Sequence, residues 1–210
     1  MATNLIQTAL LITAVQLILA ATCNKDSPRQ CRGGYVFQAT SEWSPQKRVF
    51  VVGDTLYLTS NLPKTLTDGI NPSIVVDFSN SVAIGGGIGM GYVDTVQRIP
   101  LPGRSKFDFF AITGTIGERS IAADQGLAFT YAEQSSGYRF KCGIVCKQKG
   151  IYFFSVSDLK SPGIRGKNCT NADFVMTLTN SEKNLDLYEG ATGIILDADG
   201  RNRGFAFRVQ

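Results

Sequence analysis

Short runs of β-branched and aromatic residues alternate with turn residues from Tyr35 almost to the end of the chain, and this pattern most constrains the fold. Valine, isoleucine, phenylalanine, tyrosine and threonine favour strands, whereas glycine, proline, asparagine, aspartate and serine interrupt them. Many short strands of this kind predict an all-β fold, a single β-sandwich or jelly-roll-like domain. The expected strands are residues 35–41, 48–52, 55–59, 74–78, 88–96, 107–116, 127–131, 138–146, 151–157, 174–179, 192–196 and 205–209.

One segment also fits a helix. Residues 182–188 predict a short helix with Asn180 or Ser181 as its N-cap, although the leucines in this segment would fit a strand as well. We therefore expect little helix in the whole chain.

Residues 138–146 show the clearest period-two alternation. Even-numbered positions from Tyr138 to Cys146 are apolar, while Arg139 and Lys141 lie between them, so the pattern predicts a strand with one buried face. Cys142 and Cys146 then point the same way, but four residues of strand separate them by about 13 Å, whereas a disulfide tolerates about 7 Å between Cα atoms. They cannot bond to each other.

The chain has five cysteines, at positions 23, 31, 142, 146 and 169. If Cys23 carries a lipid, the other four suit two disulfides in an oxidising compartment. We expect Cys146 to pair with Cys169, because both lie beside loops at the ends of expected strands; closing this loop of about 23 residues would contribute roughly 3 kcal/mol. Cys31 could pair with Cys142, or Cys142 could be a buried free thiol. Zinc is not expected, since the chain lacks histidine and close cysteine pairs.

The N-terminal segment from Leu5 to Ala21 is mostly apolar, but Gln7, Thr8, Thr13 and Gln16 interrupt it. It falls short of the ~20 predominantly apolar residues that span a bilayer. The segment reads as a secretory signal that is cleaved near residue 23, which places the rest of the chain outside the cytoplasm.

The junction Leu19-Ala20-Ala21-Thr22-Cys23 resembles a bacterial lipobox, which implies cleavage before Cys23 and acylation of its sulfur, for example by palmitate. Cleavage after Ala21 and an uncleaved N-terminal anchor are the alternatives. We therefore divide the chain into a signal peptide (1–22), a lipid-anchored tether (23–33) and a β-sandwich domain (34–210).

Two further stretches carry a family resemblance. Cys23-Asn24-Lys25-Asp26 after an apolar leader resembles the start of Bacteroidota lipoproteins. Cys31-Arg32-Gly33-Gly34-Tyr35, together with Gly53-Asp54-Thr55-Leu56-Tyr57-Leu58, is similar to small uncharacterised β-rich lipoproteins of that phylum. The resemblance implies a β fold and an envelope location, anchored to the outer membrane, and it supplies no activity.

Several kinds of chemistry are not expected from the composition and motifs. Without histidine, no Ser-His-Asp or Cys-His site can be built. The net charge of +4 is mild and comes with no basic motif, so nucleic acid is not an expected partner. The glycine run 85–91 does not match a phosphate-binding loop and is expected to be a bend where backbones approach closely. Residues 197–200 resemble the start of a calcium loop, but a hairpin turn explains them better. We expect no metal and no cofactor.

These features favour a non-catalytic envelope lipoprotein that serves as a binding or structural module for a glycan, a peptide or a neighbouring envelope protein. An acidic partner could meet the outward cations of one strand, Arg139, Lys141 and Lys147, with Lys149 just beyond. Five scattered aromatics could stack on sugars, although such residues usually belong to the core: Tyr35, Trp43, Tyr57, Tyr92 and Tyr131. The alternative is a hydrolase of envelope or extracellular polymers that uses two carboxylates from the set Asp77, Asp94, Asp108, Glu118, Asp124 and Glu133.

Overall fold

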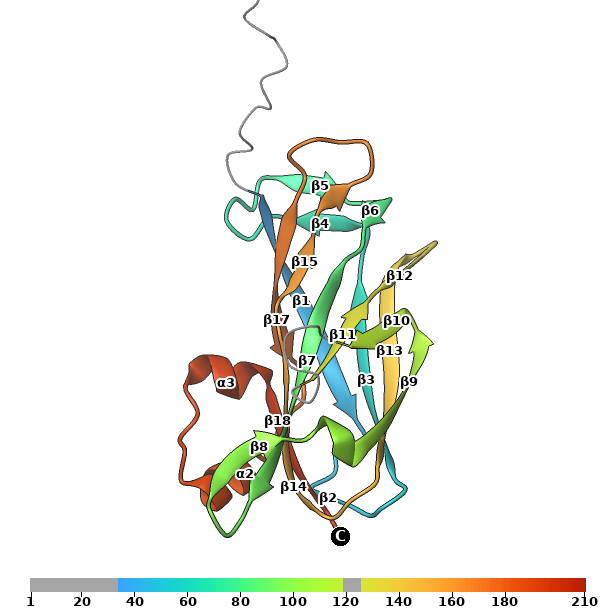
Figure 1. Cartoon of the computed structure of the whole chain (residues 1–210). Helices are drawn as coiled ribbons and strands as arrows, with labels where there is room; N and C mark the ends of the chain where they lie inside the picture. The colour runs from blue at the N-terminus through green and yellow to red at the C-terminus, as the bar shows by residue number, and fades with distance from the viewer. Residues whose placement is uncertain (1–33, 119–125) are drawn as a thin grey trace, which may run out of the picture. The chain divides into compact units, whose positions relative to one another are not determined.

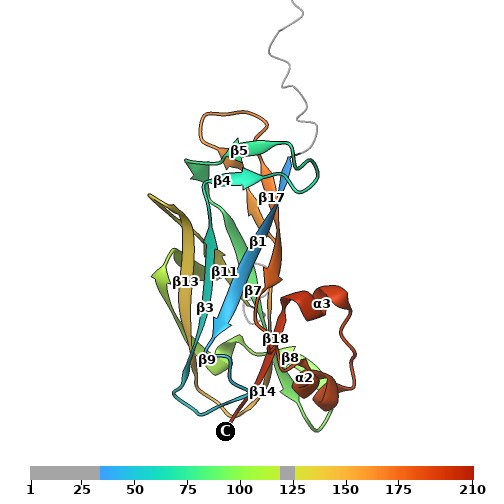
Figure 2. The ribbon, with the colours of Figure 1, turned by 180° about the vertical axis from the view of Figure 1, so that it is seen from behind.

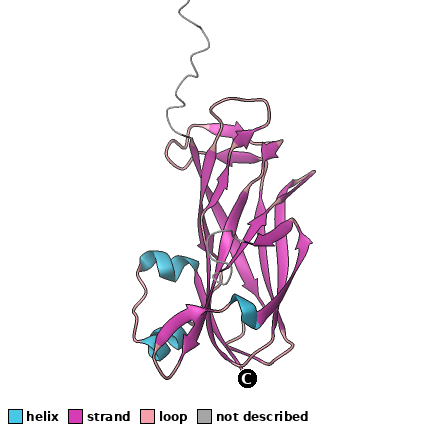
Figure 3. Ribbon diagram, in the orientation of Figure 1, coloured by secondary structure: helices cyan, strands magenta, loops and turns pink. Residues whose placement is uncertain are grey.

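The strands form two layers that face each other across an aromatic core, as a computed structural model of the chain shows for residues 34–118 and 126–210 (Figure 1). One hydrogen-bonded path runs through ten strands in the order β12-β13-β3-β1-β17-β15-β7-β14-β18-β2. It folds back at β15 (Leu159–Ser161), which bonds to β17 on one side and to β7 through the single pair Lys160 and Gly85 on the other. The predicted β-sandwich is confirmed, and strands dominate Figure 3.

The first layer is centred on β1 (Tyr35–Ser44), which pairs in parallel with β17 (Ala172–Leu178) and antiparallel with β3 (Thr55–Leu62). Beyond β3 lies β13 (Gly137–Cys146), whose far edge bonds to β12 (Ala132–Gln134) and β9 (Phe107–Thr113).

The second layer is centred on β7 (Gly85–Asp94), which lies between β14 on one side and β11 and β8 on the other. The remaining members of this layer are β14 (Gly150–Val156), β18 (Gly204–Val209), β2 (Val49–Phe50), β11 (Gly126–Thr130), β10 (Thr115–Glu118) and β8 (Ile99–Pro102).

Outside the two layers, the described residues also form two small strand ladders and three short helical elements. The ladders join β4 (Thr65–Thr67) to β5 (Val75–Asp77) and β6 (Ser81–Val82) to β16 (Gly163–Ile164). The helical elements are η1 (Arg104–Lys106), α2 (Leu185–Thr192) and α3 (Ala198–Arg203). No helix in the described part of the chain is long and apolar enough to cross a membrane.

The core fills the space between the layers with aromatic rings. Trp43 of β1 lies 5.5 Å from Phe154 of β14, and Phe129 of β11 stacks on Phe140 of β13 at 4.2 Å between ring centroids. The alternation predicted for β13 is confirmed, because its residues 138, 140, 142, 144 and 146 are all buried. Asn180 secures the end of β17 against β1: its side-chain amide accepts from the backbone N–H of Trp43 at 2.9 Å and donates to the backbone carbonyl of Trp43 at 2.8 Å.

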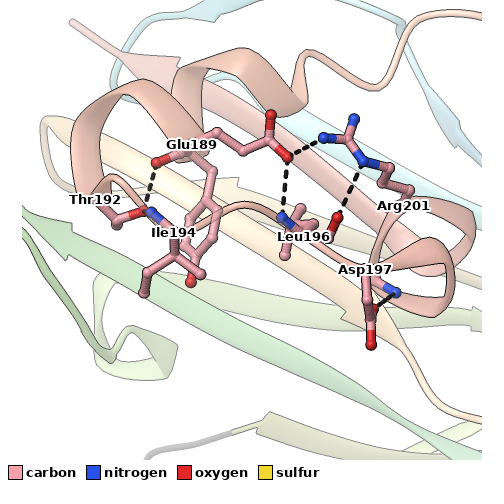
Figure 4. Close-up of polar contacts among 8 residues, drawn as sticks. Glu189, Thr192, Ile194, Leu196, Asp197 and Arg201 are labelled. Atoms are coloured by element: carbon pink, nitrogen blue, oxygen red, sulfur yellow. Dashed lines mark hydrogen bonds and ion pairs between the residues drawn. The ribbon is translucent and has the colours of Figure 1, made fainter.

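The segment that follows β17 differs from the prediction. The strand expected over 192–196 is absent, and the expected helix begins later, as α2, after Asn184 adopts a left-handed φ of 51°. Side-chain bonds fix the α2–α3 connection as an irregular loop (Figure 4): Glu189 accepts from Leu196 N–H at 3.0 Å and pairs with Arg201 at 2.5 Å. Asp197 accepts from Gly200 N–H and caps α3, so the expected hairpin turn at 199–200 is a helix start.

The glycine run forms most of the central strand β7 and not a bend. A Cβ atom at Gly86 would lie 2.6 Å from Leu159 Cδ2, and one at Gly89 would lie 2.6 Å from Ser155 Oγ. The expected close approach is therefore real, and it occurs between paired strands and neighbouring side chains.

The predicted Cys146–Cys169 disulfide is wrong. Cys142 and Cys146 are both free and buried, whereas Cys169 is exposed and disulfide-bonded, so neither of them is its partner. The reason is topological: Cys146 ends β13 beside the end of β1, while Cys169 precedes β17 beside the start of β1. Ten residues of strand, about 30 Å, separate these ends. The lipidation predicted at Cys23 lies outside the described residues.

Candidate binding face

The outer face of the first layer brings several of the predicted residues together. On β13, the residues that alternate with the buried ones point away from the core, and the register places Lys141 opposite Thr59, and Gly143 opposite Tyr57, on β3. On the other side of β13, Gly143 also pairs with Phe110 of β9. We call this surface the binding face, and in Figure 2 its strands β3 and β13 stand beside β1. The binding face consists of Tyr57, Phe110, Ile112, Arg139, Lys141 and Gly143.

Gly143 makes room for an aromatic ring. A Cβ atom at Gly143 would lie 2.3 Å from Cζ of Phe110, so the phenyl ring rests directly on the glycine backbone. Phe110 nevertheless stays 43% exposed, and Ile112 is 49% exposed. Because Tyr57 lies opposite Gly143 on the next strand, the two aromatic side chains flank the glycine in one cross-strand row.

Two cations are held in place beside this row. The Lys141 ammonium lies 5.4 Å from the centre of the Tyr57 ring, a cation–π contact. Arg139 donates from Nε to Asn61 Oδ1 at 3.0 Å. The third predicted cation, Lys147, instead pairs with Asp108 of β9 at 3.0 Å, and Lys149 lies in the exposed turn that follows β13. The positive charge on this face therefore comes mainly from Arg139 and Lys141.

The composition of the binding face suits macromolecular recognition. Tyrosine, phenylalanine and arginine are enriched at protein–protein interfaces, and tyrosine and arginine dominate their energetic centres. At the edge of the face, a hollow of about 290 Å³ opens between the two layers, lined by Arg104, Phe109, Phe110, Ala111, Ile116, Gly117 and Leu127. Phe110 belongs to both the hollow and the face, so one partner could engage both.

Sequence reasoning missed Phe110 and Ile112. Both belong to the expected strand 107–116, but the consecutive Phe109 and Phe110 hide the period of two, because apolar residues point to both sides. An alternation of two that starts at the buried Phe107 would have placed Phe110 and Ile112 on the opposite, outward side of the strand.

The aromatic residues predicted as a sugar platform do not gather on one surface. Trp43 and Tyr131 are buried in the core, and Tyr35 and Tyr92 pack against it. Only Tyr57 contributes to the binding face, and its ring already carries the Lys141 ammonium.

Two of the candidate carboxylates, Asp77 and Glu133, have pKa values that do not suit a general acid. Hydrogen bonds from Ser79 lower the pKa of Asp77, and the backbone N–H of Asn80, helped by Lys64 at 3.0 Å, lowers the pKa of Glu133. A catalytic pair needs one carboxyl group with a raised pKa as the general acid. The lowered pKa values of Asp77 and Glu133 are opposite to what that role requires.

The other candidate carboxylates either have structural roles or lie outside the residues that the structure describes. Asp94 accepts from the N–H groups of Val96 and Gln97 in the β7–β8 turn, and Asp108 pairs with Lys147. The Glu118 side chain and Asp124 lie outside the described residues.

The two buried thiols are not nucleophiles. Burial raises the pKa of Cys142 to about 12 and that of Cys146 to about 11, so neither forms a thiolate near neutral pH. Asp199, in the segment that resembled a calcium loop, pairs with Arg203 at 2.8 Å.

Comparison with known proteins gives a distant structural likeness. No protein-family model and no curated protein matches the chain. A type II cohesin module from the ScaA scaffoldin of Acetivibrio cellulolyticus aligns with a TM-score of 0.33 at 10% identity, over 66% of this chain and 92% of the module. The cohesin module of a Clostridium perfringens family 33 glycoside hydrolase aligns with a TM-score of 0.33 at 6% identity, over 68% and 98%. Likeness this weak supports no inference about function.

Proposed function

We propose that the chain is an exported, non-catalytic binding module that recognises a neighbouring envelope protein through the binding face. The observation that carries the proposal is the row of Phe110, Gly143 and Tyr57 with the Lys141 ammonium against Tyr57. In this proposal Cys23 is lipidated and attaches the module to the outer membrane, as the lipobox-like sequence suggests.

The geometry favours a protein partner with acidic side chains over a glycan. Sugar stacking needs a ring face that is free to receive the sugar, but the Tyr57 ring already carries the Lys141 ammonium. A carboxylate can reach Lys141 and Arg139 without displacing that contact, while Phe110 supplies apolar contact area beside it. Surface charges of this kind raise the association rate and make binding sensitive to salt.

Binding can be tested with residues 24–210 and an envelope extract from the native host. The immobilised module should retain a specific protein, and cross-linking followed by mass spectrometry should map the contact to β3, β9 and β13. Lys141→Glu should weaken retention about tenfold or more, because it places a repulsive charge at the centre of the interface. Lys160→Glu is the matched control, since Lys160 is an exposed cation on β15, away from the face. Equal retention by the wild type and both variants would reject the binding face.

Attachment to the membrane is tested separately. Mass spectrometry of the native N-terminus should find acylated Cys23, and Cys23→Ser in the full chain should release the protein from the membrane fraction. An N-terminus at Thr22, or an intact Met1, would refute lipidation and leave the binding proposal unaffected.

A further inference from the structure

The loop between β4 and β5 lies beside the point where the chain enters the sandwich. β1 begins at Tyr35, and the Gly69 N–H donates to the Val36 carbonyl at 2.6 Å, which holds the loop against the first residues of β1. Figures 1 and 2 place β4 and β5 at one end of the sandwich and the C-terminus at the other. A segment that precedes Tyr35 therefore joins the sandwich at the β4–β5 end.

Internal bonds make this loop a defined structure. Asp68 is only 7% exposed, and its Oδ1 accepts from the N–H groups of Val36 and Ile70, both at 3.2 Å. Asn71 Oδ1 accepts from Ser73 Oγ at 2.6 Å, and the Asp68 N–H donates to the Ile74 carbonyl at 3.0 Å. The loop is closed at its base, so its backbone is held against the start of β1.

The loop and the start of β5 present exposed aliphatic side chains, and a lysine lies near β5. Ile70 is 74% exposed, Val75 60% and Ile74 39%. Lys167 lies close enough to Asp77, the last residue of β5, to help lower the pKa of that carboxyl group, which places its ammonium near β5. Exposed aliphatic groups accompanied by lysine are typical of protein surfaces that enter the headgroup region of a bilayer.

We propose that the β4–β5 end rests on an anionic membrane surface, with Ile70 and Val75 inserted among the lipid headgroups. This inference rests on the membrane attachment in the proposed function. Eleven residues separate Cys23 from Tyr35, so a lipid on Cys23 keeps this end within about 40 Å of the bilayer. Residues 24–32 carry Lys25, Arg29 and Arg32 against Asp26, an excess of positive charge that suits anionic headgroups.

Such docking would orient the rest of the module. β3 and β13 run from the β4–β5 end to the opposite end, so with the loop on the membrane the binding face stands upright, away from the lipid surface. A partner on the same membrane could then approach it from the side.

The test uses residues 24–210, which contain the whole compact unit Gly33–Gln210 but no signal peptide and no lipid. Sedimentation with phosphatidylcholine vesicles, with and without phosphatidylglycerol, measures membrane affinity. We expect binding only to the vesicles with phosphatidylglycerol, and weaker binding at high salt. The double variant Ile70→Asp/Val75→Asp should lower the affinity about tenfold or more, because it removes two inserted groups and adds two negative charges.

The matched control carries the same changes at the opposite end. Val51 and Val52 are 54% and 48% exposed in the loop before β3, where the Val52 N–H bonds to Gln210, so Val51→Asp/Val52→Asp should bind like the wild type. Equal losses in both variants, or no wild-type binding to phosphatidylglycerol vesicles, would overturn the inference. Lipidation is judged separately, from the full chain with Cys23→Ser, so failure of one proposal does not hide failure of the other.

Discussion

The outer faces of the two layers differ in what covers them. On the second layer, the outward residues Val93, Ile151 and Ala206 form a small cluster with Tyr188 of α2, and Phe153 lies 4.5 Å from the Tyr188 ring. On the first layer, the strands β3, β9 and β13 present Tyr57, Phe110 and Lys141, with no helix packed over them in the part of the chain that the structure describes.

This difference separates two uses of apolar residues. Where the outward residues are purely apolar, the chain supplies its own cover, because exposed Val and Ile on a broad sheet face would favour aggregation. Where the outward residues mix aromatics with lysine and arginine, the face can stay in water and still offer area to a partner. The covered face therefore contributes to stability, and the open face is free for recognition.

The largest expected effect on stability comes from removing the Tyr188 side chain, which covers the outer face of the second layer. Tyr188→Ala should lower the free energy of unfolding by about 3–4 kcal/mol, because it empties the space over Phe153. Tyr57→Ala on the open face is the matched change and should cost about 1 kcal/mol or less. Urea denaturation of both variants measures the contrast, and equal losses would show that the two faces contribute alike.

A smaller effect is expected where Phe110 rests on Gly143. Gly143→Ala should cost about 1–3 kcal/mol, because the new methyl group collides with the ring and forces it aside. In the double variant with Phe110→Leu the penalty should shrink, since the flat ring is gone. A double-mutant cycle in urea gives the coupling energy, and strict additivity would contradict the observed contact.

The α2–α3 connection should respond locally. Arg201→Ala removes the guanidinium contacts to Glu189 and to the Leu196 carbonyl, so we expect a loss of about 1 kcal/mol, confined to this segment. Hydrogen exchange should accelerate over residues 185–203 and stay unchanged in β3 and β13. Lys141→Ala on the open face serves as the control, and faster exchange throughout the sandwich would argue against a local role.

The smallest expected effect concerns stability at low pH. A hydrogen bond from Arg48 lowers the pKa of Asp186 at the start of α2, so this contact stabilises the fold above the unfolded pKa of about 3.9 and is lost as pH falls through the lower folded value. Asp186→Asn should remove that part of the acid dependence. Because both side chains are exposed, the change should be just measurable in urea midpoints between neutral pH and about pH 3. An unchanged acid dependence in Asp186→Asn would show that the ion pair does not secure α2.

Local pattern was sufficient for the long strands, because period two and turn residues report directly on which side of a strand is buried. It did not predict short strands such as β8 and β15. The strand 138–146 and its outward Arg139 and Lys141 follow from that pattern alone. The disulfide prediction failed because it rested on position along the sequence, whereas the distance from Cys146 to Cys169 depends on which strands lie side by side. The strand expected at 192–196 failed for a related reason, since the bonds of Glu189 and Arg201 to Leu196 outweigh the β propensity of Ile194 and Ile195.

Only part of the binding face could be predicted from the sequence, for the same reason. The sequence pattern placed Lys141 and Arg139 on one face of a strand. The other residues of the binding face come from β3 and β9, which lie much earlier in the chain. Lys141 itself pairs with Thr59 and Thr113, about 80 and about 30 positions before it. Pairing partners at such separations leave no local signal.

The parallel pairing of β1 with β17 has a consequence for how the protein is made. Tyr35 meets Ala172, and the short strand β2 finds its partner in β18, near residue 209. A ribosome delivers the early strands long before their late neighbours exist, so neither layer can be completed until nearly the whole chain has been synthesised. Ladders that join distant parts of a chain also form slowly, because the intervening loop must close first. A nascent chain of this design stays open until late in its synthesis, which is compatible with the export proposed above.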